Sequence, residues 1–198
     1  MIDLYYFDLL GVFAFAVFGA FVAMKKKFDL FGIFVCALLN GLGGGTIREI
    51  ILGQIPGYFV NYTYIYVVCI GTFCALLLYK NFHLFQKYFL IIDAIGLVTF
   101  AYLGAARAAE FHLTGLGIVM FATISAVGGG ILRDLCLGEK PTIFYRDFYA
   151  SIAVLSGLFY AVFRENISIP LHAYALMFSM FLLRVLAIQH NWRLWKLP

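Results

Sequence analysis

Two copies of one short motif hold the residues of this chain that are best suited to chemistry in an apolar environment. The first copy occupies residues 43–49 with the sequence GGGTIRE, and the second occupies residues 128–134 with the sequence GGGILRD. Three consecutive glycines in a helix cost about 1 kcal/mol each relative to alanine and leave the backbone free to unwind. We therefore predict functional breaks in two membrane-spanning helices, with close helix packing as the alternative explanation.

Charged residues inside apolar segments strengthen this prediction. An arginine near the centre of a membrane span costs about 2.5–3.5 kcal/mol and marks a candidate functional site. At 1.5 Å per residue from Leu30, Arg48 lies roughly 27 Å along its helix. This places it on the same side as Asp8, which opens the first helix of the first copy. By symmetry, Arg133 should meet Asp93 on the opposite side.

Two interpretations of these charges stay open, and both can hold at once. The charges form structural ion pairs between helices, or they line and gate a pore. Arg133 stands beside a glycine triplet, from which it could swing between Asp93 and Asp134. Thr123 and Ser125 offer hydroxyls to a passing cation or to a neighbouring helix. The predicted pore and gating residues are Asp8, Gly43, Gly44, Gly45, Arg48, Glu49, Asp93, Thr123, Ser125, Gly128, Gly129, Gly130, Arg133 and Asp134.

The remaining reactive side chains form no recognisable catalytic or metal-binding set. The four cysteines lie in apolar segments without a C-x-x-C pair, and the four histidines lack the spacing of metal ligands. No strand is expected before the glycines and no Gly-Lys-Ser/Thr follows them, which excludes a nucleotide-binding loop. We expect a protein that is not an enzyme and uses no metal or cofactor.

The second half of the chain repeats the first. Residues Asp8 to Phe59 align without a gap on residues Asp93 to Phe144 at a constant offset of 85, with 18 identical pairs over 52 positions. Eight of these pairs are glycine or proline. Shared apolar composition would not keep residues that break regular backbone in register, so the alignment indicates a duplicated unit.

The composition indicates a membrane protein. Hydrophobic residues make up 64% of the chain and charged residues 12%, about half the charged fraction of a soluble domain. Seven apolar segments approach the length of about 20 residues that crosses a bilayer. We predict helices at Leu9–Met24, Leu30–Leu52, Tyr62–Tyr79, Phe89–Ala109, Leu116–Leu137, Phe148–Phe163 and Pro170–Ile188.

The basic residues predict the orientation. With seven spans and the N-terminus outside, the outer ends of the spans carry only Arg107 and Arg164. The inner connections and tail carry Lys25, Lys26, Lys27, Lys80, Lys87, Lys140, Arg146, Arg193 and Lys196. This asymmetry favours a cytoplasmic C-terminus and an N-terminus on the outer side of the membrane.

The repeat and the number of spans together predict an inverted pair within one transmembrane domain, residues 1–198. Three spans separate equivalent points of the two copies, so the second copy enters the membrane from the opposite side. The repeats extend over about residues 8–80 and 93–163, and an extra helix occupies about residues 170–188. Proteins of this kind place their permeation or substrate site near the midplane, between the repeats. The seventh helix has no counterpart, which suggests a role in packing or assembly.

The chain has two three-helix repeats and a seventh helix, and the second helix of each repeat carries Gly-Gly-Gly followed by arginine and an acid. In these features it resembles the prokaryotic branch of the trimeric intracellular cation (TRIC) channel family. Its bacterial members are also catalogued as a "glycine transporter" membrane family. The resemblance extends from Asp8 through the last span. It implies a homotrimer with one pore per protomer, kinked at the glycines of helices 2 and 5 and permeable to potassium or sodium. The Lys-Glu-Val signature of the animal members has no evident copy in this chain.

Two other function classes stay open. A secondary transporter for glycine or another small zwitterion would use the same inverted repeats, with half-helix ends at Gly45 and Gly130 around a carboxylate. A structural or lipid-scaffolding protein would carry no flux. In each case we expect membrane lipid around the protein and no nucleic-acid partner, because the net charge of +4 is explained by the inner loops.

Overall fold

The computed structural model describes residues 4–79, 82–145, 148–167, 170–192 and 195, and regular structure in these residues is entirely helical. The long helices lie close to the seven predicted spans. The largest difference is the start of the fourth helix, at Phe82 instead of Phe89. The helices are α1 (Leu4–Lys25), α2 (Leu30–Ile51), α3 (Thr63–Tyr79), α4 (Phe82–Glu110), α5 (Gly115–Cys136), α6 (Ala150–Ile167) and α7 (Pro170–Gln189), with 3-10 turns η1 (Gly57–Phe59) and η2 (Thr142–Phe144).

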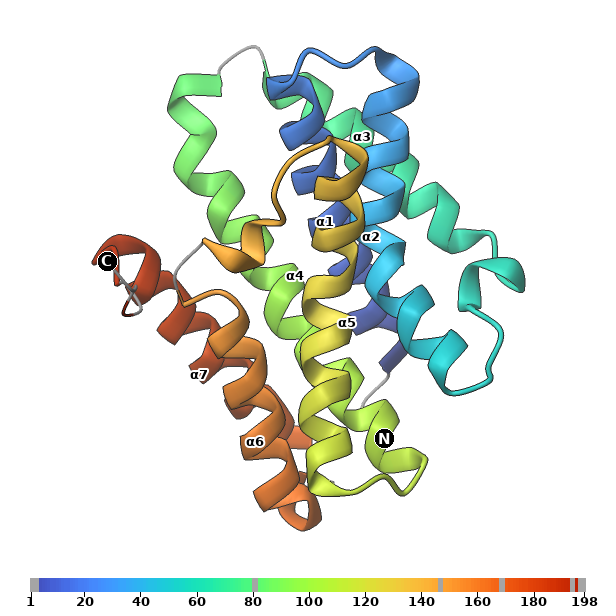
Figure 1. The fold of residues 1–198 in the computed structure, drawn as a ribbon, viewed down its shortest axis with the longest axis vertical. Helices are drawn as coiled ribbons and strands as arrows, with labels where there is room; N and C mark the ends of the chain where they lie inside the picture. Colours follow the sequence, from blue (N-terminus) through green and yellow to red (C-terminus); the bar gives the residue numbers. More distant parts are fainter. Residues whose placement is uncertain (1–3, 80–81, 146–147, 168–169, 193–194, 196–198) are drawn as a thin grey trace.

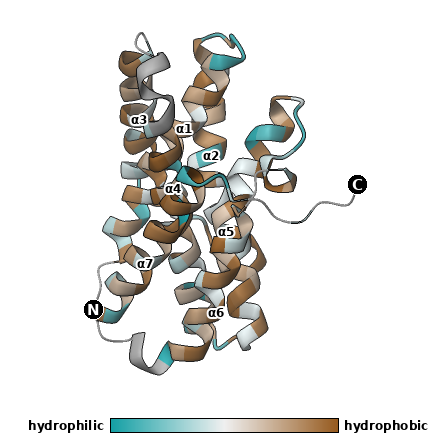
Figure 2. Cartoon of the chain, turned by 90° about the vertical axis from the view of Figure 1, so that its left-hand side faces the viewer, coloured by the Kyte–Doolittle hydropathy of each residue, from teal (hydrophilic) through white to brown (hydrophobic). Residues whose placement is uncertain are grey.

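Five of the helices are long and apolar enough to cross a membrane unaided, namely α1, α2, α4, α5 and α7. Helix α3 has 17 residues and so extends over roughly 26 Å at 1.5 Å per residue, slightly less than the hydrocarbon core. The apolar part of α6, Ala150–Arg164, is similarly short. Hydrophobic residues run along the helices and hydrophilic residues gather largely at their ends (Figure 2). The fold is therefore an all-helical membrane bundle.

The local signals that begin α2 and α5 are equivalent. Asp29 caps α2 and accepts a hydrogen bond from the Gly32 amide at 2.8 Å. Thr114, 85 positions later, caps α5 and accepts from the Gly117 amide at 3.3 Å. Such caps satisfy amide groups that have no partner within the helix. Both helices therefore begin at equivalent positions of the two repeats.

The ends of α2 and α5 are equivalent as well. Gly53 and Gly138 follow the two helices with φ of 68° and 67°. This left-handed conformation carries no steric penalty for glycine, which explains why both repeats have glycine there. Pro56 and Pro141 then introduce the 3-10 turns η1 and η2.

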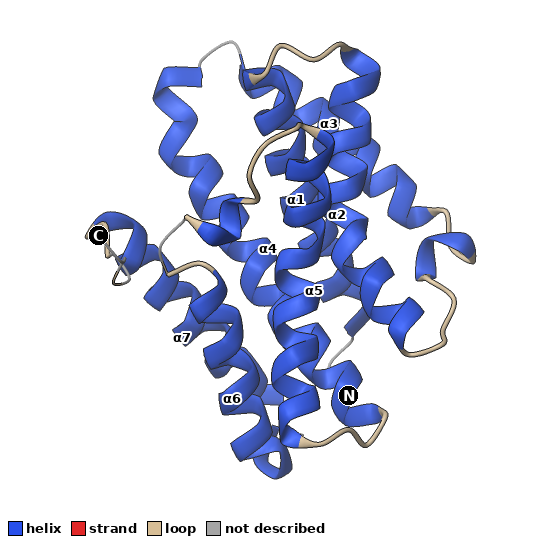
Figure 3. Cartoon of the chain, viewed as in Figure 1, coloured by secondary structure: helices blue, strands red, loops and turns tan. Residues whose placement is uncertain are grey.

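The two repeats run in opposite directions. In Figure 1, α1 and α3 run from the lower to the upper end of the bundle and α2 runs downward, whereas α4 and α6 run downward and α5 runs upward. The same arrangement is visible in Figure 3, where α7 lies beside α6 at the edge of the bundle. The second repeat is thus inverted relative to the first, as predicted.

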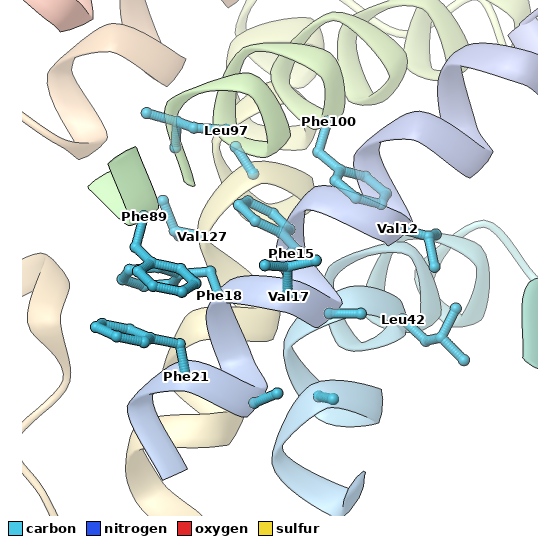
Figure 4. Packing of buried hydrophobic residues seen from close by; sticks show 14 of the residues in the cluster. Val12, Phe15, Val17, Phe18, Phe21, Leu42, Phe89, Leu97, Phe100 and Val127 are labelled. Carbon is cyan, nitrogen blue, oxygen red and sulfur yellow. The ribbon is translucent and has the colours of Figure 1, made fainter. Parts of the chain in front are cut away.

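The apolar core lies where α1 and α4 pass each other. Phe15 of α1 and Phe100 of α4 stack with their ring centroids 5.3 Å apart (Figure 4). Phe21 and Phe89 form a second stack at 3.7 Å. Outside this core, large apolar side chains such as Phe31 face outward, as expected for a surface in contact with lipid.

The predicted breaks at the glycine triplets are absent from this structure. Helices α2 and α5 continue without interruption through Gly43–Gly45 and Gly128–Gly130. The first two glycines of each triplet lie where α2 and α5 cross. A Cβ on Gly44 would lie 2.1 Å from the Ser125 carbonyl oxygen, and one on Gly129 would lie 2.3 Å from that of Asn40. The first two glycines of each triplet therefore allow close helix packing, the alternative considered above, and this contact offsets the weak helix propensity of glycine.

Candidate functional site

Two polar cavities lie near the ends of α2 and α5. Arg48 and Arg133 occupy the last turns of these helices, and the two last turns lie toward opposite ends of the bundle. The Arg48 cavity has a volume of about 270 Å³ and the Arg133 cavity about 300 Å³. They share no lining residue, so they are separate. The Arg48 cavity is lined by Leu4, Tyr5, Asp8, Arg48, Glu49, Ile55, Gly57, Tyr64, Leu103, Arg107 and Glu110. The Arg133 cavity is lined by Phe18, Phe21, Val22, Lys25, Lys26, Leu90, Arg133, Asp134, Leu137, Glu139, Thr142 and Tyr145.

Many of these lining residues are equivalent positions of the two repeats. The pairs are Tyr5 and Leu90, Arg48 and Arg133, Glu49 and Asp134, Gly57 and Thr142, Leu103 and Phe18, Arg107 and Val22, and Glu110 and Lys25. The two cavities are thus one site built twice, once from each repeat. Their charges differ, since the Arg48 cavity has three carboxylates and two guanidinium groups. The Arg133 cavity has two carboxylates and three basic side chains.

A third, smaller cavity adjoins Arg48. It has a volume of about 30 Å³ and shares Asp8, Arg48 and Glu49 with the larger cavity. Thr46 contributes a hydroxyl group to its lining and Phe100 contributes an aromatic ring. A cavity of this size has room for at least one water molecule. The Arg48 site therefore reaches toward the stacked rings of the core.

Arg133 is almost completely buried and fully engaged. Its Nε and Nη2 donate to Asp134 Oδ1 at 2.9 and 2.6 Å, and its Nη1 donates to Asn40 Oδ1 at 2.9 Å. Nη2 also reaches Thr142 Oγ1 at 3.4 Å. The guanidinium group lies 5.3 Å from the centre of the Phe18 ring. This arrangement holds the Arg133 charge in one place.

Arg48 is held by far fewer contacts. Its Nε donates to Glu49 Oε1 at 2.8 Å, and Glu49 also accepts from Arg107 Nη2 at 3.4 Å. Arg48 Nη1 is buried and has no hydrogen-bond partner among the described residues. The Ser125 hydroxyl, at the position equivalent to Asn40, likewise has none within that part of the chain. The two arginines are thus equivalent in sequence and unequal in their surroundings.

The partner predicted for Arg48 differs from the one observed. Arg48 pairs with its neighbour Glu49 instead of Asp8, although Asp8 lines both cavities beside it. Asp8 Oδ2 accepts a hydrogen bond from the Tyr64 hydroxyl at 2.8 Å. Arg48 can reach the carboxylate of the next residue on its own helix, so its ion pair forms within α2, and Asp8 stays nearby as a second carboxylate.

The same tyrosine contact recurs in the second repeat. The Tyr149 hydroxyl donates to Asp93 Oδ1 at 3.2 Å, and Asp93 is 1% exposed. Arg133 pairs with Asp134 on its own helix. Each repeat therefore holds the carboxylate on its first helix with a tyrosine at the start of its third helix, Tyr64 within α3 and Tyr149 just before α6.

The other predicted residues have varied surroundings. Thr123 donates its hydroxyl to the Val119 carbonyl oxygen at 2.8 Å, within its own helix. Gly45 and Gly130 are remote from the helix crossing, and the nearest atom to a Cβ on either would be an arginine Nη2 at 3.8 Å. The third glycine of each triplet thus leaves space beside the guanidinium group that follows it.

Sequence reasoning missed three kinds of residue that complete the site. Asn40 links Arg133 to α1 by donating to the Phe15 carbonyl oxygen at 2.6 Å. Tyr64 and Tyr149 could have been found by continuing the alignment at an offset of 85 beyond Phe59. Arg107 belongs to the Arg48 cavity, but it gave no signal because the equivalent residue in the first repeat is a valine.

The comparisons with known proteins agree with the duplicated architecture. The family model described as "Glycine transporter" matches the chain twice, over residues 5–80 and 90–165. The Escherichia coli UPF0126 inner membrane protein YadS is 31% identical over 98% of this chain and 94% of its own length. The two matches to the family model correspond to the two inverted repeats.

Solved structures of TRIC channels have the same fold. A TRIC cation channel described in "Structural basis for conductance through TRIC cation channels" is 32% identical and superposes with a TM-score of 0.87 over 100% of this chain and 98% of its own. The trimeric intracellular cation channel orthologue from Rhodobacter sphaeroides is 29% identical, with a TM-score of 0.82 over 97% of this chain and 100% of its own.

Proposed function

We propose that this chain, which belongs to the membrane protein family described as "Glycine transporter", is a cation channel that conducts potassium through one pore in each protomer of a homotrimer. The observation that carries the proposal is the pair of polar cavities that enter the bundle from opposite ends and are built from equivalent residues. Inverted repeats place a permeation path at their interface. The similarity to TRIC cation channels over nearly the whole chain supports the same function.

The path we propose joins the two cavities across the centre of the bundle. A cation entering the Arg48 cavity meets the carboxylates of Asp8, Glu49 and Glu110, which offset the two guanidinium charges there. We place the barrier along this path at the stacked Phe15 and Phe100 rings, because Phe100 lines the small cavity beside Arg48 and the stack lies in the core between α1 and α4. Conduction therefore requires a rearrangement at this stack, and the arginines raise or lower the barrier for a cation as they move.

The assembly and orientation follow from the same family relationship and from the charge of the loops. We propose a homotrimer because the structures that the chain resembles are those of trimeric channels. Apolar side chains such as Leu116 and Val162, 71% and 73% exposed in the protomer, would face lipid or neighbouring subunits. The positive-inside rule favours an extracytoplasmic N-terminus and a cytoplasmic C-terminus.

A second candidate is a transporter for a small zwitterion such as glycine. The Arg48 cavity favours it, because guanidinium groups of Arg48 and Arg107 could hold a carboxylate while Asp8 and Glu110 hold an ammonium group. Its volume of about 270 Å³ would accommodate a small amino acid. A transporter of this kind would saturate with substrate and couple its flux to an ion gradient.

Flux into proteoliposomes tests the two candidates together. Vesicles loaded with potassium chloride and diluted into a potassium-poor buffer should develop a negative interior potential when the purified protein is present. Labelled glycine should not accumulate in the same vesicles under potassium, sodium or proton gradients. Saturable, gradient-driven glycine uptake without a potassium potential would support the transporter instead.

A further inference from the structure

The two equivalent arginines are held so differently that they cannot play equal parts in gating. If the protein is the channel proposed above, we infer that the Arg48 guanidinium group moves when the pore opens, whereas Arg133 stays fixed. Asn40 is the positioning residue that fixes it. The first repeat would therefore contain the moving part of the gate, as the differences between equivalent residues of the two repeats indicate.

The first difference is at positions 40 and 125. Asn40 bridges two helices, since it donates to the Phe15 carbonyl oxygen at 2.6 Å and accepts from Arg133 Nη1 at 2.9 Å. Ser125 occupies the equivalent position, and a serine side chain is one atom too short to form the same bridge. Both Ser125 Oγ and Arg48 Nη1 are consequently buried without a partner among the described residues.

Two further differences act in the same direction. Thr142 donates its amide to Asp134 Oδ2 at 2.7 Å and also its hydroxyl to the same oxygen, which orients the carboxylate that holds Arg133. The equivalent residue in the first repeat is Gly57, which has no hydroxyl. The Phe18 ring stacks near the Arg133 guanidinium group at 5.3 Å, and its equivalent is Leu103. At all three pairs of equivalent positions, the residue near Arg48 restrains the guanidinium group less than the residue near Arg133 does.

Arg48 also has space and a second acceptor. The cavity of about 30 Å³ beside it is lined by both Glu49, its present partner, and Asp8. Gly45 leaves the nearest guanidinium nitrogen 3.8 Å from where a side chain would begin. The charged groups around Arg48 are therefore Asp8 from α1, Glu49 from α2, and Arg107 and Glu110 from α4. A swing from Glu49 toward Asp8 keeps the guanidinium group paired throughout.

Because the repeats are inverted, the choice of Arg48 over Arg133 predicts the direction in which voltage changes the open probability. The pseudo-two-fold axis in the membrane plane reverses the direction along the membrane normal. Equivalent motions of Arg48 and Arg133 would thus carry positive charge in opposite directions through the membrane field. If the guanidinium group crosses a third of the field, the ratio of open to closed channels changes about fourfold per 100 mV.

Exchanging the two residues tests the inference. We would record potassium currents in inside-out patches of giant bacterial spheroplasts, in which all molecules share one orientation, from wild type and from Asn40→Ser, Ser125→Asn and the double exchange. Ser125→Asn removes no contact and should flatten the voltage dependence. The double exchange moves the amide bridge from Arg133 to Arg48, while Asp134, Thr142 and Phe18 still contact Arg133. We therefore expect the polarity of the voltage dependence to reverse, with a shallower slope than in the wild type.

Ser156→Asn is the matched control, since Ser156 is also buried and bonds only within its own helix α6. It should keep the polarity of the wild type. A wild-type open probability that does not respond to voltage, or a double exchange with unchanged polarity, overturns the inference. So does a Ser125→Asn protein with unchanged voltage dependence. None of these results affects the proposed channel function, whereas a wild type without any current contradicts that function itself.

Thermal unfolding of the detergent-solubilised protein tests the role of Asn40 without any current. Ser125→Asn should raise the melting temperature by about 2–8 °C, because it gives partners to two buried polar atoms. Asn40→Ser should lower it by a similar amount. A Ser125→Asn protein that melts at or below the wild-type temperature would show that the new amide does not reach Arg48, and the inference would fail.

Discussion

The rings of Phe15 and Phe100 stack almost parallel, with centroids 5.3 Å apart and 9° between their planes. The two residues are equivalent positions of the repeats, so their contact lies on the pseudo-two-fold axis of the molecule (Figure 4). Each ring also packs against a glycine of the other repeat, Phe15 against Gly96 and Phe100 against Gly11. One symmetric aromatic pair therefore lies in the core where α1 and α4 pass each other.

Replacing either ring should have matched effects. Phe15→Leu and Phe100→Leu each remove one half of the stack, so each should lower the free energy of unfolding by about 1 kcal/mol and raise the open probability. Thermal unfolding and single-channel recording measure the two effects. Phe59→Leu, at a residue 69% exposed, is the control and should change neither. A change of open probability in only one of the two core variants would argue against a barrier on the symmetry axis.

The glycine triplets give a sharper prediction, because their positions differ in crowding. Gly44→Ala and Gly129→Ala place a methyl group within 2.1 and 2.3 Å of carbonyl oxygens on the other helix. Such overpacking should destabilise the protein by about 1–3 kcal/mol each. Gly45→Ala and Gly130→Ala meet nothing closer than 3.8 Å and should stabilise α2 and α5 by up to about 1 kcal/mol each.

Chemical unfolding of the four alanine variants would separate packing from helix breaking. If the triplets are packing surfaces, the second and third glycines of each triplet should respond with opposite signs. If the helices must unwind there for function, all four variants should be stabilised and all four should conduct less. Equal responses at Gly44 and Gly45 would thus contradict the packing explanation.

The ion pair of Arg133 and Asp134 should behave as a coupled unit. Arg133→Gln strands a buried carboxylate and should destabilise the protein by about 3–5 kcal/mol. Asp134→Asn strands the guanidinium group and should do the same. The double variant Arg133→Gln with Asp134→Asn should recover most of the loss, and a double-mutant cycle measures the coupling. Additive losses would mean that the main partner of Arg133 is another group.

Thiol labelling from each side of the membrane tests the topology. Lys26 forms an ion pair with Glu139, which places the loops after α1 and after α5 on one face. Cysteines at these two positions, in a background without the native cysteines, should react from the cytoplasmic side, and a cysteine at Asn61 should react from the other. Labelling of Lys26→Cys and Asn61→Cys from the same side would rule out the inverted repeat.

The sequence was sufficient for the architecture because the relevant signals are local. Apolar length predicts where α1 to α7 lie, and glycine and proline residues in register at an offset of 85 reveal the repeat. The inverted topology followed from counting spans between equivalent glycines. These features depend on backbone propensity and hydrophobicity, which are properties of short segments.

The partners within the site could not be predicted, because they depend on contacts between distant residues. A triplet such as Gly43–Gly45 weakens a helix by its intrinsic propensity, but the crossing of α2 over α5 decides whether it unwinds. Distance along a helix predicts Asp8 as the partner of Arg48, whereas Arg48 pairs with Glu49 and Asp8 accepts from Tyr64 of α3. The bond from Arg133 to Asn40 joins residues 93 positions apart, and no periodicity predicts it.

Single-channel recording of the purified wild-type protein in planar bilayers would show whether the protein is a cation channel. With a gradient of potassium chloride across the membrane, we expect unitary current steps that reverse near the equilibrium potential of potassium and do not depend on glycine. Three equivalent conductance levels would correspond to the three protomers of one trimer. A bilayer without unitary steps, from protein that accumulates glycine in vesicles, would contradict the account.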